Sequence, residues 1–134
     1  MLADTLSTLP SFLAFLAVAL AILAVFVVVY LWFTPYREIA LIRDGNPAAA
    51  ISLGGTIIGF AWPVATVIRN THSLVDLAIW SVIACLVQLA TYVVARVTMP
   101  HLAEDIPAGR TASAVFLAVL SVAVGLINAA CMEY

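Results

Sequence analysis

The chain has 134 residues, of which 66% are hydrophobic and 9% charged, and its formal net charge is −2. A soluble domain carries about 45–50% apolar and about 25% charged residues, so too few polar side chains remain here to cover a water-facing surface. All five cations are arginines and they form no basic cluster, which argues against nucleic-acid binding. Composition therefore predicts an integral membrane protein, with lipid as the solvent for most of the chain.

Four apolar segments are long enough to cross a bilayer core, which takes about 20 residues in a helix. They cover residues 12–33, 47–68, 74–97 and 111–132, and Pro35 and Pro100 follow the ends of the first and third. The first segment is too long for a cleaved signal peptide and lacks a positive start. We expect a single transmembrane domain of four helices over residues 1–134.

Local signals mark the starts of the second and fourth segments. Asp44-Gly45 predicts a turn, Asn46 can cap the helix that follows, and Pro47 suits the first helical position. Before the fourth segment, Thr111 is the candidate cap.

The arginines predict the orientation of the chain. Arg37 and Arg43 lie in the first connection, Arg96 and Arg110 flank the third, and Arg69 alone lies in the second. Because positive residues accumulate on the cytoplasmic side, the first and third connections should be cytoplasmic. Both termini should then be periplasmic.

The two halves of the chain resemble one another. Pro35 and Pro100 are 65 residues apart, and Gly45 and Gly109 are 64 apart, each pair preceding an alanine-rich segment. We expect two helical hairpin repeats, about 12–70 and 74–134, that insert in the same sense.

Small residues recur at helical spacing in the second and fourth segments. In lipid, close approach at such residues drives much of helix association. They could pack one four-helix bundle, form the face of a homo-oligomer, or do both. The residues are Gly54, Gly55, Gly59, Ser121, Gly125 and Ala129.

Polar side chains within the segments are few, and none deep within them is ionisable. That absence argues against a proton-driven carrier, which needs a titratable group inside the membrane. Gln88 and Asn128 are the buried polar candidates. They could hydrogen-bond between helices or line a narrow polar path.

Arg43 and Arg110 stand near the starts of the second and fourth helices and are candidates for binding anionic lipid. Ordinary anchoring at the membrane surface is the simpler interpretation. Nearby acids could partly neutralise these arginines, namely Glu38, Asp44, Glu104 and Asp105.

Catalytic and metal-binding motifs are not found in this sequence. No nucleophile is paired with a base, and there is neither a zinc-helix motif nor a phosphate loop. We therefore expect no enzymatic activity, no cofactor and no metal site. Cys85 and Cys131 lie in apolar runs and are interpreted as packing residues.

Three stretches resemble the YjfL family of small bacterial inner-membrane proteins, classed as domain of unknown function 350. They are RDGNPAAA (residues 43–50), the segment from Trp80 to Gln88, and GLINAAC (residues 125–131). The resemblance covers nearly the whole chain after the first ten or so residues. It implies four helices, an internal duplication and, from the genes that often neighbour family members, a link to envelope stress. It implies no activity.

Two functions remain open. The first is a non-enzymatic, homo-oligomeric scaffold or accessory factor in envelope homeostasis, which contacts membrane lipids and an envelope-stress partner protein. The second is a small ion or solute channel in which Gln88 and Asn128 line the path.

Overall fold

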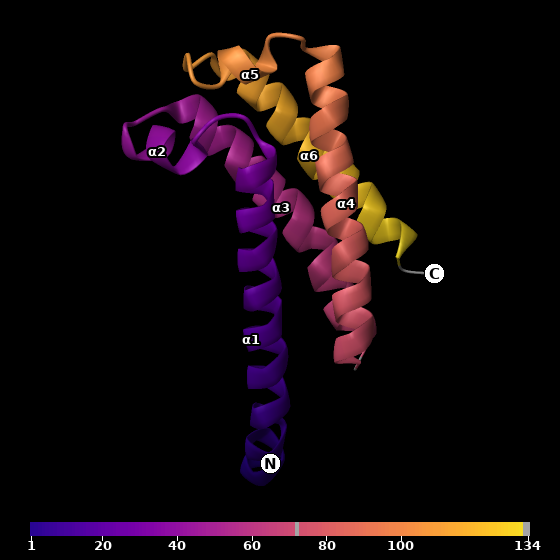
Figure 1. Cartoon of the computed structure of the whole chain (residues 1–134). Helices are drawn as coiled ribbons and strands as arrows, with labels where there is room; N and C mark the ends of the chain where they lie inside the picture. Colours follow the sequence, from indigo (N-terminus) through magenta and orange to yellow (C-terminus); the bar gives the residue numbers. More distant parts are fainter. Residues whose placement is uncertain (72, 133–134) are drawn as a thin grey trace.

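The computed structural model describes residues 1–71 and 73–132, and its regular structure there is entirely helical (Figure 1). Four helices are long and apolar enough to cross a membrane: α1 (Leu2–Phe33), α3 (Pro47–Asn70), α4 (Leu74–Thr98) and α6 (Thr111–Cys131). Two short helices, α2 (Glu38–Arg43) and α5 (Leu102–Asp105), lie in the first and third connections. The predicted all-α membrane fold with four spanning helices is confirmed.

Helices α3 and α6 form the centre of the bundle and cross backbone against backbone. A Cβ atom built on Gly59 would overlap the carbonyl oxygen of Ser121, and one built on Gly125 would overlap the backbone of Gly59. At Gly55 the added atom would lie 2.5 Å from both Cα and Cβ of Ala118. Only glycine permits this approach, in which dispersion contacts between backbones replace side-chain packing.

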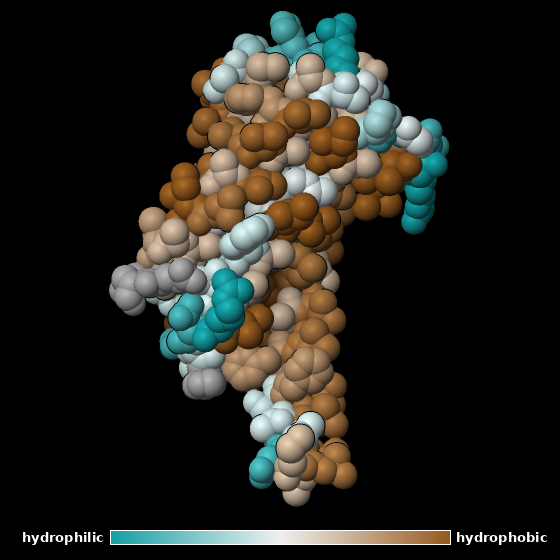
Figure 2. Space-filling model, turned by 180° about the vertical axis from the view of Figure 1, so that it is seen from behind, coloured by the Kyte–Doolittle hydropathy of each residue, from teal (hydrophilic) through white to brown (hydrophobic). Residues whose placement is uncertain are grey.

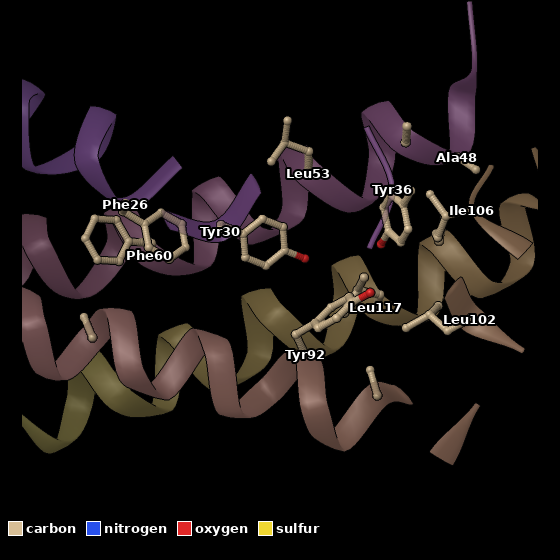
Figure 3. Packing of buried hydrophobic residues seen from close by; sticks show 14 of the residues in the cluster. Phe26, Tyr30, Tyr36, Ala48, Leu53, Phe60, Tyr92, Leu102, Ile106 and Leu117 are labelled. Atoms are coloured by element: carbon tan, nitrogen blue, oxygen red, sulfur yellow. The ribbon is translucent and has the colours of Figure 1, made fainter. Parts of the chain in front are cut away.

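Helix α4 packs against both α3 and α6, whereas α1 packs on α3 and α4, with its fully buried residues in its C-terminal half. Phe26 and Tyr30 are the buried residues of α1. Phe26 stacks on Phe60 of α3 with ring centroids 4.0 Å apart, and Tyr30 meets Tyr92 of α4 edge-on at 5.8 Å. These aromatic contacts attach α1 to the rest of the bundle (Figure 3).

The N-terminal part of α1 extends beyond the ends of α3 and α4 (Figure 1). The helix begins at Leu2, well before residue 12, where we expected the span to start. Its 32 residues span about 48 Å at 1.5 Å per residue, against a bilayer core of about 30 Å.

The two connections that carry α2 and α5 lie at the same end of the molecule (Figure 1). Each closes with a glycine at positive φ, Gly45 at 86° and Gly109 at 79°, a conformation in which a side chain would be strained. The hydrogen bonds match as well, from Asn46 N to Leu41 O (2.9 Å) and from Arg110 N to Asp105 O (3.0 Å). This similarity supports the internal repeat, although duplication itself stays a prediction.

The predicted cap of α3 is confirmed, because the Asn46 side chain accepts a hydrogen bond from Ala49 N at 3.1 Å. Its Nδ2 also donates to the carbonyl oxygens of Ile106 and Pro107, which joins the two halves of the chain. The predicted cap at Thr111 is wrong. The turn after α5 ends with Arg110 in an extended conformation, so Arg110 occupies the cap position and Thr111 is the first helical residue.

Hydrophobic side chains cover most of the length of the helices, and hydrophilic ones gather toward the ends of the molecule (Figure 2). In the view of Figure 2 the largest hydrophilic group lies at the end that carries α2 and α5. A surface of this kind suits lipid along the helices and water at their ends.

Candidate functional site: a buried carboxyl and a polar seam

Five polar or aromatic side chains are buried together where the end of α1, helix α2 and helix α4 meet. We call them the Glu38 corner: Tyr30, Thr34, Tyr36, Glu38 and Tyr92. Pro35 ends α1 and the chain bends sharply there, so the first residue of α2 lies against the end of α1. Figure 3 shows the tyrosines of this corner, with the hydroxyl groups of Tyr36 and Tyr92 near one another.

Glu38 is fully buried, with an exposed fraction of 0%. The sequence placed it among acids at the membrane edge that could neutralise arginines, and for Glu38 that interpretation is wrong. Its Oε1 instead accepts a hydrogen bond of 2.5 Å from the Thr34 hydroxyl. Within residues 1–71 and 73–132, Oε2 has no hydrogen-bond partner and no cation forms an ion pair with the carboxyl group.

Burial raises the pKa of Glu38 from 4.5 to about 7, because a carboxylate loses its hydration in an apolar surrounding. The Thr34 hydrogen bond acts in the opposite direction and lowers the pKa, since it stabilises the ionised form. Near neutral pH the carboxyl group can therefore exist either protonated or ionised.

The tyrosine hydroxyls beside Glu38 are also incompletely bonded. Among the described residues, neither the Tyr36 hydroxyl nor the Tyr92 hydroxyl has a hydrogen-bond partner of good geometry. Burial raises the pKa of Tyr36 above its usual range, with the neighbouring Tyr92 hydroxyl the next cause and Glu38 the smallest, so this hydroxyl stays protonated. An unbonded buried polar group costs about 1–3 kcal/mol. The corner therefore suits a bound water molecule, or a proton on the Glu38 carboxyl group.

A line of hydrogen-bonding groups continues from this corner into the bundle. We call it the polar seam: Tyr30, Thr56, Ser121 and Gln88. The Thr56 hydroxyl lies 3.3 Å from the Tyr30 hydroxyl and 3.4 Å from that of Ser121. Gln88 Nε2 donates to the Ser121 carbonyl oxygen at 3.1 Å, which links α4 to α6.

The two buried polar candidates differ in their surroundings. Gln88 is 1% exposed and belongs to the seam, but its Oε1 has no partner in the described part of the chain. Asn128 is half-buried on α6, and its Nδ2 is likewise without a described partner. The structure therefore brings Gln88, but not Asn128, into a hydrogen bond between helices.

The small-residue candidates lie mainly between α3 and α6. Gly55, Gly59, Ser121 and Gly125 meet at the crossing, and Ala129 is buried further along α6. Gly54 is separate, because a Cβ there would meet nothing within 4 Å. Within one chain, the glycine faces of α3 and α6 are thus occupied by one another.

The two arginine candidates do not form one site. Arg110 lies 3.8 Å from Asp105, which confirms that an acid can partly neutralise it. Arg43 instead lines an open cavity of about 390 Å³ together with Arg37, at the bend between α1 and α2. These exposed cations suit contact with lipid headgroups.

Comparison with known proteins places the chain in a family. The family model described as Domain of Unknown Function (DUF350) matches residues 4–132. This chain belongs to the DUF350 family.

Two curated relatives of this DUF350 protein are the proteins named UPF0719 inner membrane protein YjfL from Escherichia coli strain K12 and from strain O157:H7. Each is 33% identical over 129 residues, which cover 96% of this chain and 98% of the relative. No solved structure matches. With four spanning helices and these relatives, the chain is an inner membrane protein of an uncharacterised family, as the resemblance predicted.

The sequence did not predict the Glu38 corner, because Glu38 lies between the spans, where an acid is normally solvated. Two signals were available. Thr34 precedes Glu38 by four residues, across the bend at Pro35, and tyrosines at positions 30 and 36 flank the bend. Tyrosines together with a hydroxyl residue around one acid are consistent with a buried hydrogen-bonded carboxyl group.

Proposed function

We propose that this DUF350 protein is a non-enzymatic, homo-oligomeric membrane scaffold in envelope maintenance, with α1 as its self-assembly helix. The supporting observation is a row of exposed leucines on α1. We call it the leucine stripe: Leu2, Leu6, Leu9, Leu13, Leu16 and Leu20. Their exposed fractions lie between 43% and 74%.

The leucine stripe has the spacing of a coiled coil. Steps of four and three residues alternate along its whole length, which is the a/d pattern of a heptad repeat. Most of the stripe faces away from the bundle, because Phe15, Ile22 and Phe26 point inward from the other side of the helix. Leu16 and Leu20 also border cavities that are lined in part by α3, so the four N-terminal leucines are the part of the stripe that is open to a partner.

A second copy of the same chain fits this stripe. All copies insert in one sense, so their α1 helices are parallel and equivalent leucines stand at the same depth. The N-terminal residues of α1 also extend past α3 and α4 (Figure 1). Leucines of the stripe that lie outside the lipid would gain from burial against a partner at about 25 cal/mol per Å². Those within the lipid would gain only packing contacts.

The centre of the bundle also favours a scaffold over a pore. The backbones of α3 and α6 meet at Gly59 and Gly125 without room for a methyl group. The cavities of the described structure that we identify lie on its outer surface, and none is lined by Gln88. A conducting path through this crossing would need the contact to open, whereas a scaffold would not.

Cysteine cross-linking tests the self-assembly helix. In a chain whose Cys85 and Cys131 are replaced by alanine, Leu6→Cys should form a disulfide-linked dimer in membranes, and the neighbouring Ser7→Cys should form far less. Ser7 is the matched control, because it lies at the same depth but about 100° around the helix. The combined Leu6→Ala and Leu13→Ala variant should reduce the oligomer mass measured by light scattering in detergent.

Other occupants of the stripe give different results. A wild-type chain that is monomeric in detergent and not cross-linked in membranes would reject self-assembly. An oligomer that cross-links equally at Ser7 would retain the scaffold and reject the stripe as its interface. Purification of a stoichiometric second protein that is lost in the leucine variant would point to a different partner on this surface.

A second candidate function is a narrow path for a small ion or solute, favoured by unbonded polar atoms in the bundle interior. Ser81 Oγ, Gln88 Oε1 and Asn128 Nδ2 have no described hydrogen-bond partner. Purified protein in liposomes should show no flux if the scaffold proposal is correct. Flux that Gln88→Leu or Asn128→Leu abolishes, with unfolding midpoints unchanged, would favour the path instead.

The orientation is part of the proposal. A reporter that is active only in the periplasm should be active when it is fused after Tyr134, because four of the five arginines lie in or beside the first and third connections. A cytoplasm-only reporter fused at the same residue is the control and should be silent. The opposite pair of results would place both termini in the cytoplasm.

A further inference from the structure

We infer that the carboxyl group of Glu38 is a proton-binding site on the membrane scaffold, and that loss of its proton loosens the attachment of α1 to α4. The observations are the complete burial of Glu38, its unbonded Oε2, and its position at the bend that joins α1 to α2. The site does not require α1 to pair with a second copy.

The other members of the Glu38 corner carry no charge. Helix α1 contributes the Tyr30 hydroxyl and Thr34, the bend contributes Tyr36, and α4 contributes Tyr92. Arg96 is the nearest charged group on α4, and it acts on Tyr92. Helix α3 presents hydroxyls here, chiefly that of Thr56, and no titratable group.

The remaining charged groups nearby form no ion pair with Glu38 among the described residues. Arg37 and Arg43, before and within α2, are exposed and line the same open cavity as Thr34, Tyr36 and Glu38. Asp105, in the connection that carries α5, accepts a hydrogen bond from the Ser113 hydroxyl at 2.7 Å and pairs with Arg110. Proton binding at Glu38 is thus set by burial and hydroxyl groups, and not by a partner charge.

The protonated and ionised forms make different demands on the corner. Protonated Glu38 is neutral, and its Oε2 gains a hydrogen that can be donated to a neighbouring oxygen. When the proton leaves for solvent, the Glu38 carboxylate carries a negative charge, which is stabilised by the hydrogen bond that the Thr34 hydroxyl donates to it. Because an uncompensated buried charge is costly, the carboxylate is stabilised either by water that enters the corner or by movement of its side chain toward solvent.

Movement at this corner acts directly on α1. Tyr30 lies on its last turn and Thr34 is its C-terminal cap residue, and Tyr30 and Phe33 both contact the ring of Tyr92. These rings and the Phe26–Phe60 stack are the main buried contacts of α1. Hydration of Glu38 would separate Tyr30 from Tyr92 first, and α1 would gain freedom at its attached end.

Infrared titration of the full chain in lipid nanodiscs tests the proton site. We expect the carbonyl stretch of a protonated carboxyl group that disappears near neutral pH, above the ordinary range of an exposed glutamate. The band should be absent in Glu38→Gln and kept in Glu104→Gln, whose side chain is 83% exposed. Thr34→Val should move the titration to higher pH, because it removes the hydrogen bond that stabilises the ionised form.

Spin labels test the coupling to α1. In the chain without native cysteines, labels at the exposed positions Val28 on α1 and Val93 on α4 report the separation of these helices. Their distance distribution should broaden between about pH 5 and about pH 9 in the otherwise native chain, and it should stay narrow in Glu38→Gln.

Three results would overturn the inference. The first is a carboxyl band that titrates in the ordinary glutamate range, and the second is a band that persists in Glu38→Gln. The third is a change of the spin-label distance with pH that is the same in Glu38→Gln. If Glu38→Gln does not fold, the shift of the native band in Thr34→Val still decides the assignment.

Discussion

Replacement of Gly59 by leucine is expected to unfold or rearrange the bundle, at a cost of more than about 3 kcal/mol. The first atom of the new side chain would overlap the Ser121 carbonyl oxygen and would lie 2.8 Å from Gln88 Nε2. The carbonyl belongs to a helix backbone and cannot rotate away as a side chain can. Helices α3 and α6 would have to separate along their whole contact. The unfolding midpoint in detergent and the gel-filtration profile measure the effect.

Gly54→Leu is the matched control for this prediction. It makes the same chemical change five residues away on the same helix, where an added Cβ meets nothing within 4 Å. We expect a change within about 0.5 kcal/mol, as for other substitutions away from packed sites. If Gly59→Leu elutes and unfolds like the wild type, the close crossing of α3 and α6 is refuted.

The architecture could be predicted from the sequence because bilayer physics leaves few alternatives. Apolar segments of spanning length must be helical to satisfy their backbone groups. Prolines and turn glycines then give the boundaries, as at Pro35, Gly45 and Pro47. The cap at Asn46 was predictable for the same reason, whereas the cap at Thr111 depended on how the preceding turn closes.

The candidate site could be predicted only in part. Gly55, Gly59 and Gly125 were recognisable from spacing, and Gln88 from its polarity within an apolar segment. The residue that each of them contacts on another helix could not be predicted, because the relative rotation of two helices depends on all their contacts together. Sequence spacing alone could not separate Gly54, on the open side of α3, from Gly55 at the crossing.

Glu38 was misassigned for a physical reason. Burial of a carboxyl group depends on how the chain folds back after α1, and hydropathy along the sequence does not contain that information. The consequence is functional. The absence of ionisable groups within the spans argued against a proton-driven carrier, yet the connection supplies a fully buried carboxyl group at the end of the bundle.

The second large effect is a loss of stability with rising pH. The free energy of unfolding should fall as the pH rises from about 4.5 to about 7, and it should stay constant above about 7. The folded chain has the higher pKa at Glu38, about 7 against 4.5 for a free side chain, so it holds the proton more tightly than the unfolded chain. Between these values the folded state binds more protons, and the free energy of unfolding decreases with pH. A difference of this size corresponds to up to about 3 kcal/mol.

Glu38→Gln should remove this dependence and make the protein more stable than the wild type at alkaline pH. Glutamine is nearly isosteric with the protonated acid and can still accept the hydrogen bond from Thr34, but it never acquires the buried charge that opposes folding. Unfolding midpoints measured across this pH range, with Glu104→Gln as the exposed control, test both statements. Parallel curves for the wild type and Glu38→Gln would mean that the corner is hydrated in the folded protein and that its carboxyl group ionises freely.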